Sequence, residues 1–199
     1  MERTHHQVEQ GTEAWLQLRA GRFTASQIKN ILMGQTTKGY QDEIKRVAFE
    51  LYARQRVEDV FQSSYMKRGK ELEPEARRIY EATTFNIVKE AGFFAFGEYL
   101  GASPDGLIGD SGLIEIKCPK YNTIIDCLIE KKVPRDYDIQ MQTQMLCTDR
   151  VWCDFMVYYP GLEPSIIRVE KCEVLQHKIL IAAEKAFEDA KDIIKIIKK

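Results

Sequence analysis

The most informative part of the chain is residues 103–118, which read SPDGLIGDSGLIEIKC. Its second half alternates apolar and charged residues, as a β-strand does when successive side chains point to opposite faces. Glu115 and Lys117 therefore share one face of a predicted strand, while the neighbouring isoleucines face a core. The Asp-Ser-Gly sequence before this strand is typical of a turn, and a hairpin there would bring Asp105 close to Glu115.

Two carboxylates and one ammonium on a single patch suit metal-assisted hydrolysis of a phosphodiester. Close carboxylates repel each other, and a divalent cation such as Mg²⁺ is the natural partner for hard oxygen ligands. Lys117 cannot be a ligand while it is protonated, but it can hold or polarise a water molecule, or stabilise developing charge. A half-exposed strand with a cross-strand salt bridge to Asp105 would show the same alternation, so both interpretations stay open on this pattern alone.

Composition limits the class of protein. The chain has 199 residues, with 29 Lys or Arg, 30 Asp or Glu and a net charge of -1, which excludes a globally basic protein that coats nucleic acid by charge alone. We expect a cytosolic protein, because neither an apolar membrane span nor an N-terminal signal core is present. The five cysteines include no C-x-x-C pair and the three histidines are scattered, so a zinc or iron–sulfur site is poorly supported.

Hydrophobic periodicity predicts a single α/β (α+β) domain in which helices flank a mixed central sheet. Residues 1–82 are expected to be mainly helical, residues 83–170 to form the sheet core, and residues 174–198 to form a C-terminal helix. The other predicted helices begin near residue 12, follow residues 24–26, and cover 41–59, 71–82, 122–130 and 138–147. The predicted strands are 85–88, 93–96, 99–102, 107–108, 113–118, 151–159 and 165–169.

Further polar residues fit such chemistry but have ordinary explanations. Gln140, Gln142 and Gln144 interrupt an apolar run and either orient a water molecule or form a solvated helix face. The arginines around residues 19–26 either bind an anion at a helix N-terminus or flank an ordinary capped helix. Three basic clusters are candidates for a DNA track or plain surface: Lys67, Arg68 and Lys70; Lys131, Lys132 and Arg135; and Lys195, Lys198 and Lys199.

Several motifs in this order resemble the lambda-exonuclease family, the YqaJ-type viral recombinases of the PD-(D/E)xK nuclease superfamily. The resemblance covers about residues 9–159. It rests on GTEAW with LRAGRFTAS at residues 11–26, on Arg68-Gly69 with Glu73, on Ser103-Pro104-Asp105-Gly106, on Glu115-Ile116-Lys117-Cys118-Pro119, and on Gln140-Met141-Gln142. It implies the restriction-endonuclease-like core of that superfamily.

The resemblance also implies a function. It implies a phage-type, Mg²⁺-dependent 5′→3′ exonuclease, with Mn²⁺ as a possible substitute, that degrades linear double-stranded DNA to 5′-mononucleotides and leaves a 3′ single-stranded tail for recombination. It implies a homotrimeric ring around DNA, a single-strand annealing protein as partner, and a location in the host cytoplasm. By motif position, the resemblance implies that Asp105 and Glu115 bind metal with support from Glu73. It implies that Lys117 activates water and that Gln142 helps to hold the water or Lys117. The residues that it implies for binding the 5′-phosphate are Arg19, Ser26 and Ser103.

One position departs from the family pattern. The best-known member carries a second phosphate-binding arginine six residues after the catalytic lysine, where this chain has Thr123, with Lys120 nearby. A threonine cannot replace a bidentate guanidinium, so either another basic residue substitutes or the dependence on a 5′-phosphate is weaker. A restriction or repair endonuclease and a non-catalytic DNA-end-binding module are the alternative functions; the complete Asp105, Glu115 and Lys117 set disfavours the latter.

Overall fold

The computed structural model describes residues 1–57 and 64–199, with the backbone alone for 64–66. The helices are α1 (Glu13–Arg19), α2 (Ile28–Leu32), α3 (Lys38–Ala53), α4 (Ser64–Thr84), α5 (Tyr121–Glu130), α6 (Arg135–Thr148) and α7 (Glu173–Ile197). The strands are β1 (Arg3–His6), β2 (Phe23–Thr24), β3 (Val88–Lys89), β4 (Phe93–Phe96), β5 (Leu100–Ala102), β6 (Gly106–Ile108), β7 (Gly112–Lys117), β8 (Trp152–Val157) and β9 (Ser165–Glu170). The predicted α/β class is thereby confirmed.

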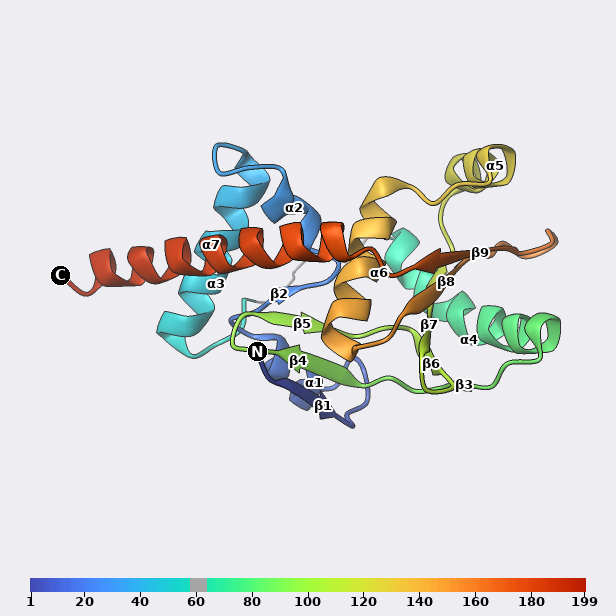
Figure 1. The fold of residues 1–199 in the computed structure, drawn as a ribbon, viewed down its shortest axis with the longest axis horizontal. Coiled ribbons are helices and arrows are strands. Elements are labelled where there is room, and N and C mark those ends of the chain that lie inside the picture. Colours follow the sequence, from blue (N-terminus) through green and yellow to red (C-terminus); the bar gives the residue numbers. More distant parts are fainter. Residues whose placement is uncertain (58–63) are drawn as a thin grey trace.

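A five-stranded mixed sheet forms one half of the molecule, in the order β3-β6-β7-β8-β9. Its central strand β7 pairs antiparallel with β6 and parallel with β8. Helix α4 covers one face, where Ala76 and Tyr80 pack against Ile114 and Ile116, and α6 lies on the other face (Figure 1). Because both faces are covered, Glu115 is only 1% exposed, so the strand is not half-exposed.

A second, four-stranded sheet accompanies the five-stranded one, whereas the sequence predicts a single central sheet. Its order is β1-β4-β5-β2, and it includes β1 and β2 from the part of the chain expected to be mainly helical. β1 pairs antiparallel with β4, and the His5 ring stacks on Phe94 with 4.0 Å between ring centroids. β1 was missed because its stability comes from a partner strand some ninety residues away rather than from an apolar pattern of its own.

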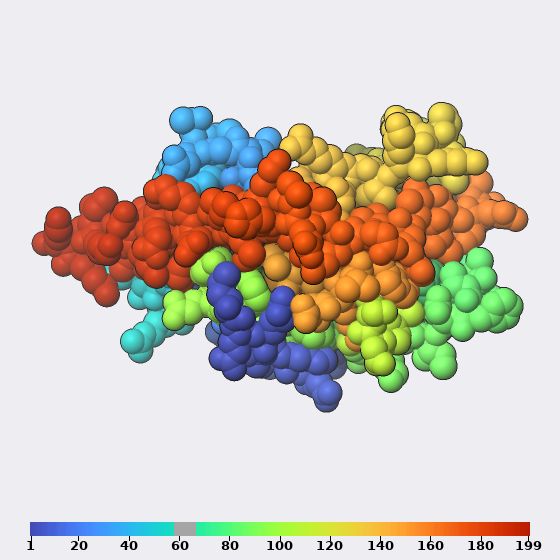
Figure 2. All heavy atoms as spheres, in the orientation of Figure 1, coloured from blue at the N-terminus to red at the C-terminus, as the bar shows by residue number. Residues whose placement is uncertain are grey.

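Helices α2, α3 and α6 pack with α7 into a helical layer, and α7 runs along much of the length of the molecule (Figure 1). Tyr40 of α3 and Phe187 of α7 belong to the main apolar core, which continues to Phe23 of β2. The C-terminal part of α7 projects from the body at one end (Figure 2). None of the helices in the described ranges is long and apolar enough to cross a membrane.

Two helix boundaries differ from those predicted. Helix α3 ends at Ala53, because Arg54 adopts a left-handed conformation with φ 53°, whereas the sequence favours a helix to residue 59; residues 58 and 59 lie outside the described residues. Helix α4 begins at Ser64 rather than near residue 71, so Pro74 lies inside the helix and not in its first turn. Proline has no N–H to donate, so the carbonyl four residues earlier loses its usual partner at this point.

Candidate active site

Asp105 and Glu115 converge as the sequence predicts. Gly106 of β6 pairs with Ile114 of β7, so the bend before β6 lies beside the end of β7. The Asp105 Oδ2 atom accepts a hydrogen bond of 2.6 Å from the Ile116 backbone N–H, which fixes the carboxyl at this edge. Burial raises the pKa of Asp105 well above its ordinary value, and the nearby Glu115 and Glu73 carboxylates add to that rise, against the opposing effect of Lys117.

Lys117 lies on the same face of β7 as Glu115 and forms an ion pair with its Oε1 atom. Burial lowers the pKa of Lys117, but the Glu115 and Asp105 carboxylates outweigh burial, so that the pKa stands above its ordinary value. The ammonium also lies over the Tyr137 ring, 5.3 Å from its centroid. Lys117 is therefore a fixed cation in this arrangement, suited to orient water or to stabilise negative charge rather than to bind a metal.

Two glutamines of α6 hold Glu115, and they are not the glutamine expected from the resemblance. Gln140 Nε2 donates to Glu115 Oε1 over 2.6 Å, and Gln144 Nε2 donates to Oε2 over 2.5 Å. Gln142 points to the other side of the helix, where its amide donates to the Glu170 carbonyl and accepts from the Cys172 N–H. The structure therefore does not bring Gln142 to the cluster, because residues two apart lie on opposite faces of a helix.

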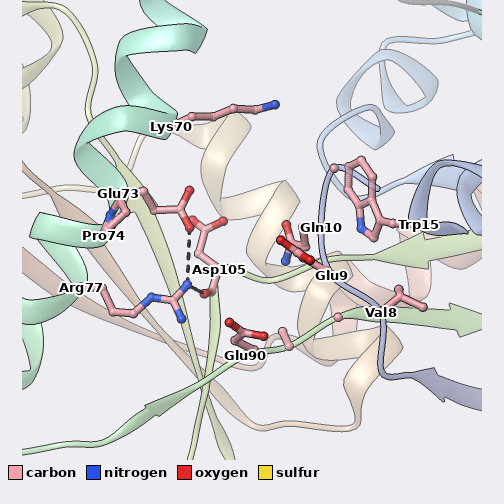
Figure 3. A pocket seen from close by; sticks show the side chains of 13 residues that line it. Val8, Glu9, Gln10, Trp15, Lys70, Glu73, Pro74, Arg77, Glu90 and Asp105 are labelled. Atoms are coloured by element: carbon pink, nitrogen blue, oxygen red, sulfur yellow. Dashed lines mark hydrogen bonds and ion pairs between the residues drawn. The ribbon is translucent and has the colours of Figure 1, made fainter. Parts of the chain in front are cut away.

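Glu73 approaches Asp105 from α4. Its carboxylate and that of Asp105 point toward one another (Figure 3). Arg77, one helical turn further along, forms an ion pair of 3.4 Å with Glu73 and donates to the Asp105 backbone carbonyl over 2.6 Å. Arg77 is not among the sequence-predicted site residues, although its spacing of four residues from Glu73 is the spacing at which helical side chains pair.

A cleft of about 490 Å³ opens in front of these carboxylates. Asp105, Glu73 and Arg77 line one wall, and Trp15 and the N-terminal segment before α1 line the other (Figure 3). The further residues that line the cleft are Val8, Glu9, Gln10, Gly11, Lys70, Pro74, Glu90, Ala91 and Gly92. The chain thus forms a concave site with convergent charged groups, which is the usual form of a small-molecule or substrate site.

The residues expected to bind a 5′-phosphate are partly assembled beside this cleft. The Trp15 indole N–H donates to Ser103 Oγ over 2.7 Å, and the Arg19 guanidinium stacks on the Trp15 ring at 4.1 Å from its centroid. Arg19 also donates to Thr24 Oγ1 over 3.4 Å. Arg19 and Ser103 are therefore joined through Trp15, whereas Ser26 is exposed and the hydroxyl that Arg19 reaches is that of Thr24.

Thr123, at the position where the family's best-known member has an arginine, lies half-buried on α5. Lys120 is the N-cap residue of the same helix and is exposed. Arg46 and Arg56 are further candidates for the positive charge that Thr123 does not supply, because they line a small hollow together with Arg19.

The donor set fits a divalent cation of the Mg²⁺ type. Asp105 and Glu115 supply hard carboxylate oxygens, and burial, together with repulsion by the neighbouring carboxylates that a cation would relieve, raises the pKa of Asp105. Within residues 1–57 and 64–199, no three His, Cys, Asp or Glu side chains lie close enough together to hold a metal ion by themselves. Mg²⁺ commonly uses one or two carboxylates together with water and substrate phosphates, and Glu73 lines the cleft beside Asp105.

Two acidic residues and a lysine at the end of the central strand of a mixed sheet, with helices on both faces, define a nuclease core of the PD-(D/E)xK type. The YqaJ-like viral recombinase domain matches residues 14–151, and the chain belongs to this family. An alkaline exonuclease (LHK-Exo) from Laribacter hongkongensis has 34% sequence identity and a TM-score of 0.85, over 94% of this chain and 96% of that chain.

The other comparisons agree with this assignment. A structure of LHK-Exo in complex with dAMP matches to the same extent, with 34% identity and a TM-score of 0.85. A phage related exonuclease from Haemophilus somnus 129PT shares the fold at 16% identity, with a TM-score of 0.67 over 90% of this chain and 98% of that chain. A search of curated protein sequences finds no match. The chain is thus a homologue of alkaline exonucleases.

Proposed function

We propose that this protein is a Mg²⁺-dependent 5′→3′ exodeoxyribonuclease that degrades one strand of linear double-stranded DNA to 5′-mononucleotides. The observation that carries the proposal is the convergence of Asp105, Glu115 and Lys117, of which Asp105 lines a cleft whose other wall holds Trp15. The complex of the 34% identical LHK-Exo with dAMP supports a nucleotide product. The remaining 3′ single-stranded tail would serve recombination by strand annealing.

The chemistry follows from the positions of the charged groups. In each cycle a water oxygen forms a bond to phosphorus, the bond from phosphorus to the 3′ oxygen breaks, and the released 3′ oxygen takes up a proton. Lys117 orients the attacking water and stabilises the charge on the phosphate, while Asp105 and Glu115 would hold the divalent cation. When bound, that cation supplies Lewis acidity toward the phosphate and the water. Mn²⁺ has the same preference for oxygen ligands and is expected to substitute.

Arg19 and Ser103 explain how such an enzyme selects an end. A guanidinium and a hydroxyl beside the cleft can bind the 5′-terminal phosphate, with Thr24 as the hydroxyl that Arg19 reaches. Ser26 is then a more distant contributor than its motif position implies. The family resemblance further supports a homotrimeric ring around DNA, a single-strand annealing protein as partner, and action in the host cytoplasm.

The test is a comparison of DNA ends. The full-length protein is incubated with linear duplex DNA carrying a 5′-phosphate or a 5′-hydroxyl, and with closed circular duplex, with and without Mg²⁺. We expect release of 5′-mononucleotides from linear DNA in the presence of Mg²⁺, faster from phosphorylated ends, and an intact circle. Cleavage of the circle would instead indicate an endonuclease, and binding without hydrolysis would indicate a DNA-end-binding module.

A further inference from the structure

The two oxygens of Glu115 are held differently. Oε1 receives two donors, the Lys117 ammonium and the Gln140 amide. Oε2 receives one donor in the described part of the chain, the Gln144 amide at 2.5 Å. A carboxylate oxygen has two lone pairs, so those of Oε1 are both in use, whereas Oε2 keeps one for another partner.

From this asymmetry we infer that Gln144 is a positioning residue, which fixes Glu115 so that Oε2 is the oxygen presented to the divalent cation. The inference rests on the proposed function, because it assigns the metal-facing atom of that same site. Gln144 acts through Glu115 rather than on the substrate, as outer-shell partners of metal ligands commonly do.

The surroundings of Gln144 support this role. Its side chain is fully buried, and its Oε1 atom has no hydrogen-bond partner among the described residues. The opposite amide orientation would place this oxygen against the Glu115 carboxylate, which is repulsive, so the donor must face Glu115. An unsatisfied buried carbonyl costs folding free energy, and an apolar side chain would avoid that cost. What Gln144 contributes is therefore its hydrogen bond to Glu115.

Helix α6 offers matched controls, since it carries three glutamines in different environments. Gln140 donates to the oxygen that is already saturated, and Gln142 holds the Glu170–Cys172 segment on the other side of the helix. A change at Gln140 should leave Oε2 in place. A change at Gln142 should disturb packing around α7 without releasing Glu115.

The experiment measures Mn²⁺ affinity by isothermal titration calorimetry on the full-length protein without DNA, for the wild type and for Gln144→Met, Gln140→Met and Gln142→Met. We expect the dissociation constant of Gln144→Met to rise by about tenfold to a hundredfold. Gln140→Met should change less, and Gln142→Met should match the wild type per folded molecule. Circular dichroism and urea unfolding check that each variant folds, and Gln144→Asn, which is too short to reach Oε2, is the second variant.

A second readout separates positioning from a purely structural role. Nucleotide release by the Gln144 variant should need a higher Mn²⁺ concentration for half-maximal rate and should recover at saturating Mn²⁺. Wild-type Mn²⁺ affinity in both Gln144 variants would overturn the inference, and so would an equal or larger loss in Gln140→Met. Failure of the proposed function is distinct, because it would show as an absence of DNA hydrolysis by the wild type, whatever the affinities.

Discussion

The two sheets contribute different things to one site. The five-stranded sheet carries the reactive groups, since Glu115 and Lys117 lie on its central strand and are fixed by α6. The groups suited to bind a DNA end lie around the four-stranded sheet: Arg19 on α1, between β1 and β2, and Ser103 directly after β5. The difference indicates that hydrolysis and the selection of a DNA end can be altered separately, by changes in different parts of the molecule.

The substitution expected to have the largest effect is Lys117→Ala, which removes a reactive group from the five-stranded sheet. Loss of the only ammonium paired with Glu115 among the described residues should lower the rate of nucleotide release by about a hundredfold to a thousandfold, because charge on the phosphate is no longer stabilised. Binding to linear DNA ends, measured by fluorescence anisotropy, should persist. Lys185→Ala is the control, since Lys185 pairs with Asp189 on α7. Release at the wild-type rate would remove Lys117 from the mechanism.

The complementary change in the other half is Arg19→Ala. The preference for 5′-phosphorylated over 5′-hydroxyl ends should fall by about tenfold, as expected for the loss of a charge-assisted hydrogen bond. The rate on 5′-hydroxyl ends should change little, because the reactive groups belong to the other sheet. Arg19→Lys should restore only part of the preference, since an ammonium lacks the planar fork. An unchanged ratio of the two rates would assign end selection elsewhere.

A third change tests the face of the five-stranded sheet that the site does not use. Asp154 of β8 is 3% exposed and accepts hydrogen bonds from Tyr80 and from two nitrogens of Arg168. Asp154→Ala should lower the free energy of unfolding by about 2 kcal/mol, because the buried Tyr80 hydroxyl loses its partner. Urea denaturation measures the change. Asp192→Ala removes an exposed ion pair and should cost under about 1 kcal/mol; equal losses would contradict the argument.

The smallest effect concerns pH and the helices over the four-stranded sheet. Burial, together with a 2.7 Å hydrogen bond to Asp189, raises the pKa of Tyr40 to about 12. The neutral hydroxyl therefore stabilises the fold below the ordinary tyrosine pKa of about 10, and that contribution is lost as the pH rises through about 12. Tyr40→Phe should show a shallower decline in the free energy of unfolding over this range. Parallel curves for the two proteins would rule out this coupling.

The sequence predicts features that depend on local pattern. The alternation around Glu115 and the turn before it were enough to place Asp105 and Lys117 together, and α6 and α7 follow the expected ranges within a few residues. The sequence left open whether Glu115 lies on a half-exposed strand, because the helix that covers it comes later in the chain. Which glutamine reaches Glu115 depends on the rotation of α6, which only packing decides.

Features set by distant partners were not predictable. β1 and β2 become strands because β4 and β5 offer them hydrogen bonds, and neither strand has a strong apolar alternation. Pro74 indicates a helix start by its chemistry, but α4 continues through it. The role of Arg77 was not predictable either, because its hydrogen bond to the Asp105 backbone carbonyl joins segments 28 residues apart.

The short segment from Ser103 to Asp105 joins the two sheets, since β5 ends at Ala102 and β6 begins at Gly106. The two residue steps from Ser103 to Asp105 span at most about 7 Å of extended chain, and Pro104 between them restricts the backbone. A terminal phosphate bound at Ser103 would then lie at a fixed distance from the scissile phosphate near Asp105. This fixed distance would make every released fragment the same length, however long the duplex.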